Sequence, residues 1–348
     1  MALDHAAASV GVSLQAETYG GQPAILLSWP YWVTGLFTNI AAPTFWFLSG
    51  TSITLFSDGK RRQGFTEWEI TRHLMIRALV IIVLDMTICQ FFWAGNGPYL
   101  HVLTSIGVGL ALMSVLRLLP DTLLFLLLVG SMLIYQMILP TLGVQLSQTT
   151  NFPIAFLLTY STRIWPSVEF STLGWAPLMG LGLLLGRKIN TPAFQRATSW
   201  FGIGSALLLS WFLLREGGGF GDLTPYSSDQ PWYFFIIMSK TPPSFTYLLF
   251  NLGISAVLMG LLILSGSMLS RKPLLWIVMV GQVALFFFVL HIVIYGIFGR
   301  IVRLMEIPLP GVVLAVLVWS LGMIALLPIT LMYRNIRKRY PQSVLKYL

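Results

Sequence analysis

Long apolar runs separated by short polar loops dominate the chain. Nine runs come close to the roughly 20 apolar residues that cross a hydrocarbon core of about 30 Å. The pattern therefore predicts an all-α fold, a polytopic helix bundle in a membrane, with residues 1–348 forming one transmembrane domain. The predicted spans cover residues 34–56, 74–93, 100–118, 121–139, 172–186, 197–214, 243–265, 274–298 and 310–333.

Two further segments are apolar but short. Residues 152–160 are too brief to cross a bilayer, and we interpret them as an interfacial or re-entrant piece. Residues 1–14 lack the basic start of a signal peptide, and Asp4 and His5 interrupt them. We expect this segment to be the end of a tenth span whose first half is missing from the chain.

Composition supports a membrane protein. Of the 348 residues, 56% are hydrophobic and 9% charged, whereas soluble domains have roughly 45–50% apolar and about 25% charged residues. The net charge of +9 lies in short loops between apolar spans, which is typical of membrane topology and not of nucleic-acid binding. The single cysteine, Cys89, excludes an intramolecular disulfide and a cysteine-rich metal site.

The basic residues also predict the orientation. One set of loops holds 16 of the 21 Lys and Arg residues, and the opposite set holds the other five, Arg163, Arg215, Lys240, Arg300 and Arg303. Cytoplasmic loops carry the excess of Lys and Arg in membrane proteins. The loop 57–73 and the C-terminus are therefore predicted to be cytoplasmic.

Two ionisable residues, His291 and Asp85, lie deep within the apolar spans. His291 lies 17 residues after the start of the span 274–298, about 25 Å from the cytoplasmic end. Asp85 lies near the middle of 74–93, with Arg77 eight positions earlier and close enough for a water-mediated bridge. Such residues are candidate functional groups. The structural alternatives are a packed histidine bonded to a neighbouring carbonyl and, for Asp85, an ion pair or a protonated acid bonded to another helix.

Histidines also gather toward the outer side. His5 falls near the outer end of the first segment and His101 at the outer start of 100–118. The carboxylate of Asp4 can hold the tautomer of an imidazole and raise its basicity, although adjacent helix positions do not face each other. Asp4 and His5 are therefore either a pair or two residues with different partners. The simpler interpretation of His101 is a headgroup residue, and that of His73 is part of the basic cytoplasmic face.

Two outer segments suit anions. Lys240-Thr-Pro-Pro-Ser244 predicts a helix start, where proline is tolerated and exposed N–H groups attract anions. Its alternative is a rigid helix entry with a snorkelling lysine. Arg163 could bind a phosphate or carboxylate, or anchor the interface beside Trp165. The histidines show no HxxxH or HExxH spacing, so we expect no metal site.

Four motifs together resemble one family. They are Met-Ala-Leu-Asp-His at 1–5, Ala-Ala-Pro-Thr-Phe-Trp-Phe-Leu-Ser-Gly-Thr at 41–51, Ser-Lys-Thr-Pro-Pro-Ser-Phe-Thr-Tyr-Leu-Leu-Phe-Asn-Leu-Gly at 239–253, and Gly-Gln-Val-Ala-Leu-Phe-Phe-Phe-Val-Leu-His at 281–291. The chain resembles, over nearly its whole length, the bacterial relatives of heparan-α-glucosaminide N-acetyltransferase, within the wider set of membrane acyltransferases.

The resemblance implies a bundle of ten or eleven helices in a bacterial inner membrane. It implies transfer of an acetyl group from cytoplasmic acetyl-coenzyme A to an amine or hydroxyl, typically of a sugar, on the outer side. A histidine near the outer face acts as base or carries the acetyl group, and that role falls to His5 or else to His291. Membrane lipid, acetyl-coenzyme A and the acceptor are the expected partners, and a homo-oligomer stays open.

Acyl transfer also fits the residues themselves. The reaction needs a base for the attacking group and a donor for the tetrahedral oxyanion. His5 with Asp4 supplies the first, and Lys240, Asn39 or Ser244 the second. The main alternative is a transporter of an envelope substrate that uses Asp85 and His291, but transporters often show internal repeats and this sequence shows none. A structural or sensory membrane protein is the third interpretation.

Overall fold

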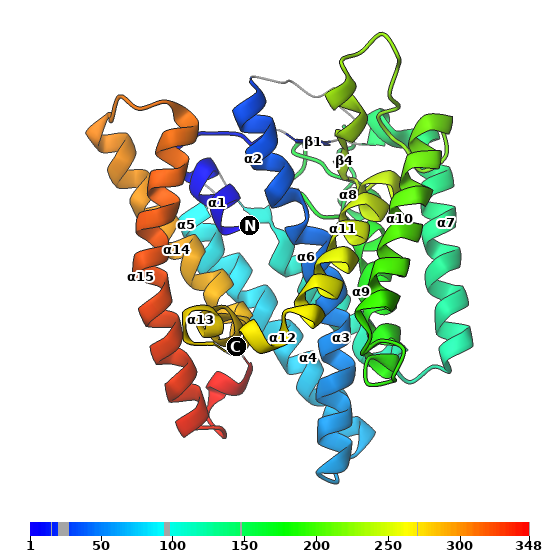
Figure 1. Cartoon of the computed structure of the whole chain (residues 1–348), viewed down its shortest axis with the longest axis vertical. Helices are drawn as coiled ribbons and strands as arrows, with labels where there is room; N and C mark the ends of the chain where they lie inside the picture. Colours follow the sequence, from blue (N-terminus) through cyan, green and yellow to red (C-terminus); the bar gives the residue numbers. More distant parts are fainter. Residues whose placement is uncertain (15, 20–27, 94–97, 147, 270, 348) are drawn as a thin grey trace.

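The computed structural model describes residues 1–14, 16–19, 28–93, 98–146, 148–269 and 271–347. Most of its helices run along the long axis of the molecule (Figure 1). Within these residues, six helices are long and apolar enough to cross a membrane: Glu67–Trp93, Asp121–Pro140, Ala197–Gly217, Phe245–Leu264, Ala284–Met305 and Gly311–Arg339. They confirm an all-α fold and indicate an integral membrane protein.

Helices account for nearly all of the regular structure. They are α1 (Ala2–Ser9), α2 (Trp29–Asn39), α3 (Ala41–Arg62), α4 (Glu67–Leu84), α5 (Gln90–Trp93), α6 (Val102–Leu116), α7 (Asp121–Leu146), α8 (Phe152–Leu158), α9 (Thr172–Lys188), α10 (Ala197–Gly217), α11 (Phe245–Leu264), α12 (Gly266–Leu269), α13 (Lys272–Gly281), α14 (Ala284–Met305) and α15 (Gly311–Arg339). Each predicted span overlaps one or two of these helices. The short apolar segment 152–160 forms the short helix α8.

Small residues let the central helices touch. A Cβ atom on Gly50 of α3 would lie 1.7 Å from the carbonyl oxygen of Met179, and one on Gly182 of α9 would lie 1.8 Å from that of Phe47. Side chains at these positions would push the two backbones apart. Gly50 and Gly182 therefore permit close packing, and α3 and α9 form a tight central pair of the kind common in membranes.

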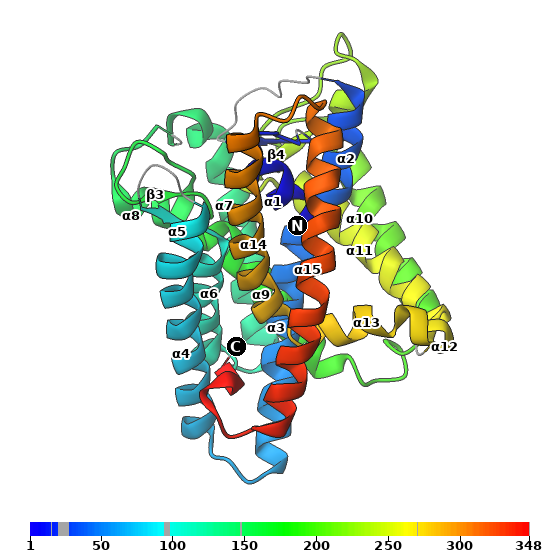
Figure 2. The ribbon, with the colours of Figure 1, turned by 90° about the vertical axis from the view of Figure 1, so that its left-hand side faces the viewer.

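The prediction of one continuous span over 274–298 is wrong. The helix breaks at Gln282 and Val283, and α13 lies across the bundle while α14 runs along it (Figure 2). Arg334 Nε donates to Gln282 Oε1 at 2.6 Å and Arg337 Nη1 to the Gln282 carbonyl at 3.3 Å. These bonds compensate the interrupted helix. His291 thus lies seven residues into α14, about 10 Å from its start, and not deep in a single long helix.

A second irregularity directly follows α4, within the span Glu67–Trp93. Residues Asp85–Cys89 form a π-helical turn, η1, which joins α4 to α5. Such turns insert a residue into the helix and occur often at functional sites. Here the turn faces the start of α6, where it positions Asp85.

Two small parallel sheets join distant loops at one end of the bundle. β1 (Glu17–Tyr19) pairs with β4 (Met238–Thr241), and β2 (Tyr99–Leu100) pairs with β3 (Ser167–Val168). The α3–α4 turn and the end of α15 lie at the opposite end (Figure 1). The sheets therefore gather loop side chains at the end of the bundle where α6 begins at His101.

Candidate functional site

A cavity of about 320 Å³ lies beneath the β1–β4 pair. We call it the histidine cavity. Its polar lining combines two histidines, two carboxylates, a lysine and three hydroxyl groups: His5, His101, Asp4, Glu169, Lys240, Ser13, Tyr19 and Thr38. The site thus holds both general bases and hydrogen-bond partners for a polar ligand.

Two histidines from opposite ends of the chain form a pair. His5 Nδ1 lies 2.7 Å from His291 Nε2, and His291 Nδ1 lies 3.1 Å from the carbonyl oxygen of Phe287. A carbonyl oxygen only accepts hydrogen bonds, so Nδ1 of His291 carries a proton. When both rings are neutral, His291 Nε2 then accepts from the N–H of His5. This assignment from the hydrogen-bond network leaves a lone pair on Nε2 of His5.

The contact between α1 and α14 fixes this pair. A Cβ atom on Gly299 would lie 2.3 Å from the carbonyl oxygen of Ser9, so only glycine allows α1 to approach this closely. Arg303 of α14 donates to the same carbonyl and satisfies the end of α1. Ala6 and Ala7 of α1 are fully buried. The alanines of α1 have a high helix propensity, and their small side chains let the helix pack closely against its neighbours.

Aromatic rings enclose His5. The ring of Trp93 lies 4.5 Å from that of His5, and Phe288 lies 5.7 Å away, edge to face. The ring of His101 is 5.6 Å distant. These contacts restrict rotation of the imidazole, so the hydrogen bond to His291 and the packing together set its orientation.

Asp85 positions His101. Its Oδ2 accepts hydrogen bonds from the backbone N–H of Thr104 at 2.8 Å and from the Thr104 hydroxyl at 2.7 Å. His101 is the N-cap residue of α6, so the carboxylate on the neighbouring π turn satisfies one of the orphan N–H groups in the first turn of that helix. The structure therefore places Asp85 behind His101 and outside the lining of the histidine cavity.

Glu169 accompanies His101 in the cavity wall. Its Oε2 lies 3.7 Å from His101 Nε2 and accepts a hydrogen bond from the Tyr99 hydroxyl. Burial raises the pKa of Glu169 and favours its protonated, neutral form. Sequence reasoning missed Glu169, although it is one of only 12 acidic residues in a strongly apolar chain.

Lys240 is paired, although it lines the cavity. Its Nζ donates to Glu17 Oε1 at 2.5 Å and to the Tyr19 hydroxyl at 3.2 Å. The Tyr19 hydroxyl donates in turn to Glu17 Oε1 at 2.8 Å. The β1–β4 pairing creates this triad, and the buried positive charge has a partner already. Neither Glu17 nor Tyr19 follows from the pattern of apolar spans.

Other predicted site residues lie elsewhere. Ser244 caps α11 by accepting from the backbone N–H of Tyr247 at 3.2 Å. Asn39 Nδ2 donates to the carbonyl of Ala16 at 3.0 Å. Arg163 lies in an exposed loop. The histidine cavity is not lined by Ser244, Asn39 or Arg163.

A second, larger cavity of about 550 Å³ opens nearer the end of α15. We call it the arginine cavity, because Arg77 and Arg337 line it together with mainly apolar side chains of α3, α4, α6 and α14. The lining contains no Asp or Glu side chain among the residues that the structure describes. Arg77 Nε is buried and has no hydrogen-bond partner in that part of the chain. Arg77 and Asp85 therefore lie in separate environments, and the expected water-mediated bridge between them does not form.

The arginine cavity has a basic mouth. A neighbouring space of about 290 Å³ is lined by Arg334, Arg337 and Lys338 and shares Gln282 and Val283 with the cavity. The break between α13 and α14 forms this shared wall. Irregular backbone at membrane depth is tolerated where it lines such a space.

Two stacked rings lie between the cavities. Phe45 lines the arginine cavity, and its ring centroid is 6.1 Å from that of Phe288. Phe288 packs in turn against His5 and against His291, at 5.7 and 4.9 Å. The rings of Phe45 and Phe288 thus lie between the half-buried Arg77 and the histidine pair.

No three His, Cys, Asp or Glu side chains in the described residues are arranged to hold a metal ion. Comparison of the chain with protein-family models and with curated proteins gave no match. Function is therefore inferred from the arrangement of side chains. These side chains provide an imidazole nitrogen with a lone pair beside a polar cavity, and a second cavity, suited to anions, behind the rings of Phe45 and Phe288.

Proposed function

We propose that this protein is a membrane acyltransferase that moves an acetyl group from acetyl-coenzyme A to an amine or hydroxyl of a sugar. The observation that carries the proposal is the His5–His291 pair, which leaves His5 Nε2 as a base in the wall of a polar cavity. The separate arginine cavity supplies a second binding region. A two-substrate reaction needs two such regions that meet at one catalytic group.

His5 performs the proton transfer in this proposal. Its Nε2 takes the proton of the acceptor N–H or O–H while the acceptor atom attacks the thioester carbonyl. The C–S bond then breaks, and the proton returns from His5 to the leaving thiolate. The same nitrogen also serves a route in which it first carries the acetyl group.

The arginine cavity suits the donor. Arg77 and Arg337 offer guanidinium groups to phosphate oxygens, and the basic mouth with Arg334 and Lys338 extends this field. The apolar walls beyond them accommodate an extended arm. Phe45 and Phe288 must shift for the acyl group to reach His5, because their rings lie between the cavities.

The histidine cavity suits the acceptor. Asp4 and Glu169 bring carboxyl groups, and Tyr19, Ser13 and Thr38 bring hydroxyl groups to its wall. These groups bind the hydroxyls and amine of a sugar through hydrogen bonds. Asp4 lies in this wall and is not bonded to His5 in the observed arrangement, so we assign it to acceptor binding.

The proposal includes a topology. The positive-inside rule places the α3–α4 turn, the end of α15 and the arginine cavity on the cytoplasmic side. The histidine cavity then faces the outer side of a bacterial inner membrane. Together with the six long apolar helices, α3, α6 and α9 make up nine spans, which form one domain.

The decisive experiment measures binding and turnover of radiolabelled acetyl-coenzyme A by the full chain in lipid nanodiscs, with glucosamine as acceptor. Saturable binding and labelled product support the proposal. A wild-type protein that neither binds acetyl-coenzyme A nor forms product would refute it and favour transport of an envelope substrate, with Asp85 and His291 as its polar residues.

A further inference from the structure

A third cavity lies at the end of the bundle that holds the α3–α4 turn. It has a volume of about 260 Å³. Three arginines from three different segments line it: Arg61 at the end of α3, Arg117 at the C-cap of α6 and Arg187 near the end of α9. We call it the three-arginine cavity. Thr54, Ser57, Leu119 and Leu183 complete its lining.

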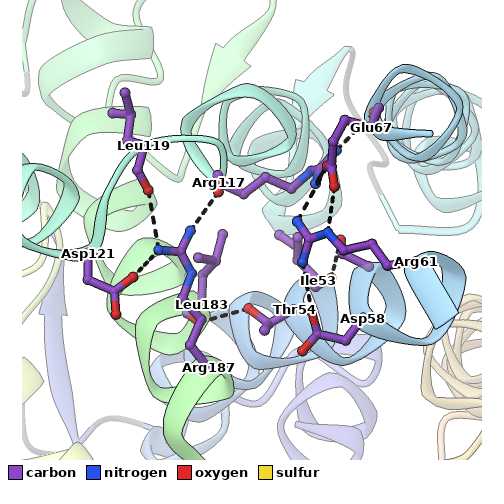
Figure 3. A network of polar contacts seen from close by, with 11 residues as sticks. Ile53, Thr54, Asp58, Arg61, Glu67, Arg117, Leu119, Asp121, Leu183 and Arg187 are labelled. Atoms are coloured by element: carbon purple, nitrogen blue, oxygen red, sulfur yellow. Dashed lines mark hydrogen bonds and ion pairs between the residues drawn. The ribbon is translucent and has the colours of Figure 1, made fainter. Parts of the chain in front are cut away.

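The acidic partners of these arginines lie outside the cavity. Arg61 pairs with Asp58 at 2.7 Å and with Glu67 at 2.5 Å. Arg187 pairs with Asp121. Figure 3 shows these ion pairs. The described lining of the cavity contains none of them, so its charged lining residues are all arginines.

One N–H donor among these three arginines has no acceptor. The Arg117 side chain is 3% exposed, and its terminal nitrogens bond to Glu67 and to the Thr71 hydroxyl. Its Nε is buried without a hydrogen-bond partner in the described part of the chain. A buried charged group with an unused donor is costly, and native proteins usually supply a partner for it.

We propose that the three-arginine cavity binds a phosphate group. Guanidinium forks match phosphate oxygens in geometry and charge, and basic pockets between transmembrane helices on the cytoplasmic side bind lipid headgroups. The phosphate belongs either to the headgroup of an anionic phospholipid or to a soluble phosphate. The site connects α3 to α6 and α9, so an occupant braces these helix ends. This proposal does not depend on acyl transfer.

Thermal unfolding of the full chain in phosphatidylcholine nanodiscs tests the proposal. Inorganic phosphate is added to one set at constant ionic strength, with chloride as the reference. Phosphatidylglycerol is included in the bilayer of another set. A ligand that binds only the folded protein raises the unfolding midpoint. A rise with phosphate alone identifies a soluble ligand, and a rise only with phosphatidylglycerol identifies a lipid headgroup.

Neighbouring residues provide matched controls. Arg61→Gln and Arg187→Gln should abolish the ligand-dependent rise, whereas Arg62→Gln and Lys188→Gln remove the same charge beside the cavity and should retain it. Arg61→Lys keeps the charge without the fork, and we expect at least a tenfold weaker apparent affinity, about 1.4 kcal/mol, even if the glutamine variants fold poorly.

Two results would overturn the proposal. One is the absence of any rise in wild type with either ligand. The other is an equal ligand-dependent rise in wild type and in the Arg61 and Arg187 variants. The arginines would then act only as a clamp between helix ends, and their substitution would lower the midpoint by the same amount with and without ligand.

Discussion

Replacement of His291 by phenylalanine tests whether this residue sets the tautomer of His5. The side chain of phenylalanine fills a similar volume but cannot accept the hydrogen bond that His5 Nδ1 makes at 2.7 Å. The proton of neutral His5 is then no longer held on Nδ1. The form with the lone pair on Nε2 loses its advantage, and the fraction of competent enzyme falls.

The lost hydrogen bond sets the magnitude. An unsatisfied buried donor costs about 1–3 kcal/mol, which corresponds to a loss of roughly 5-fold to 150-fold in the competent fraction. The loss should appear in kcat with little change in KM for acetyl-coenzyme A, because His291 does not line the arginine cavity. His291→Gln supplies a side-chain oxygen that accepts the hydrogen bond, and it should recover most of the rate.

The assay is steady-state transfer of labelled acetyl to glucosamine by wild type, His291→Phe and His291→Gln. Each sample is checked for an unchanged unfolding midpoint. Equal rates in wild type and His291→Phe would refute the tautomer argument. Equal losses in the phenylalanine and glutamine variants would assign His291 to packing alone.

Three further outcomes follow from the same contacts. Gly50→Ala should lower the unfolding midpoint by several degrees, because the added Cβ overlaps the backbone of α9; an unchanged midpoint contradicts the packing. Arg77→Gln should weaken acetyl-coenzyme A binding by roughly 10-fold to 150-fold, as for a hydrogen bond to a charged group, with unchanged affinity for the sugar. Lys240→Met should destabilise the fold by about 3–5 kcal/mol, because it leaves Glu17 buried without its partner.

Local apolar runs predict most of the helices, because membrane helices must satisfy their backbone bonds within one segment. The break in 274–298 is different in origin. Gly281-Gln-Val283 reads as part of an apolar run, and the bonds that compensate the break come from Arg334 and Arg337, more than 50 residues away. Tertiary partners of this kind leave no local pattern.

The candidate site, too, was predicted where it depends on local sequence and missed where it depends on tertiary contacts. Hydropathy and charge placed His5 and His291 on one side, but their contact joins residues 286 positions apart and depends on Gly299. The predicted bridge between Arg77 and Asp85 is absent for a simpler reason. Eight residues at 100° each leave an offset of about 80° on an ideal helix, so Asp85 points toward α6 while Arg77 enters the arginine cavity.

The most direct test of the central claim compares single-turnover acetyl transfer by His5→Ala and by His73→Ala, with acetyl-coenzyme A binding measured on the same samples. His73 packs between Phe56 and Tyr347, away from the histidine cavity. Removal of a general base costs about 100-fold to 10,000-fold, so His5→Ala should lose at least 100-fold in rate while both variants bind the donor. Equal transfer rates in the two variants would contradict the assignment of His5 as the catalytic base.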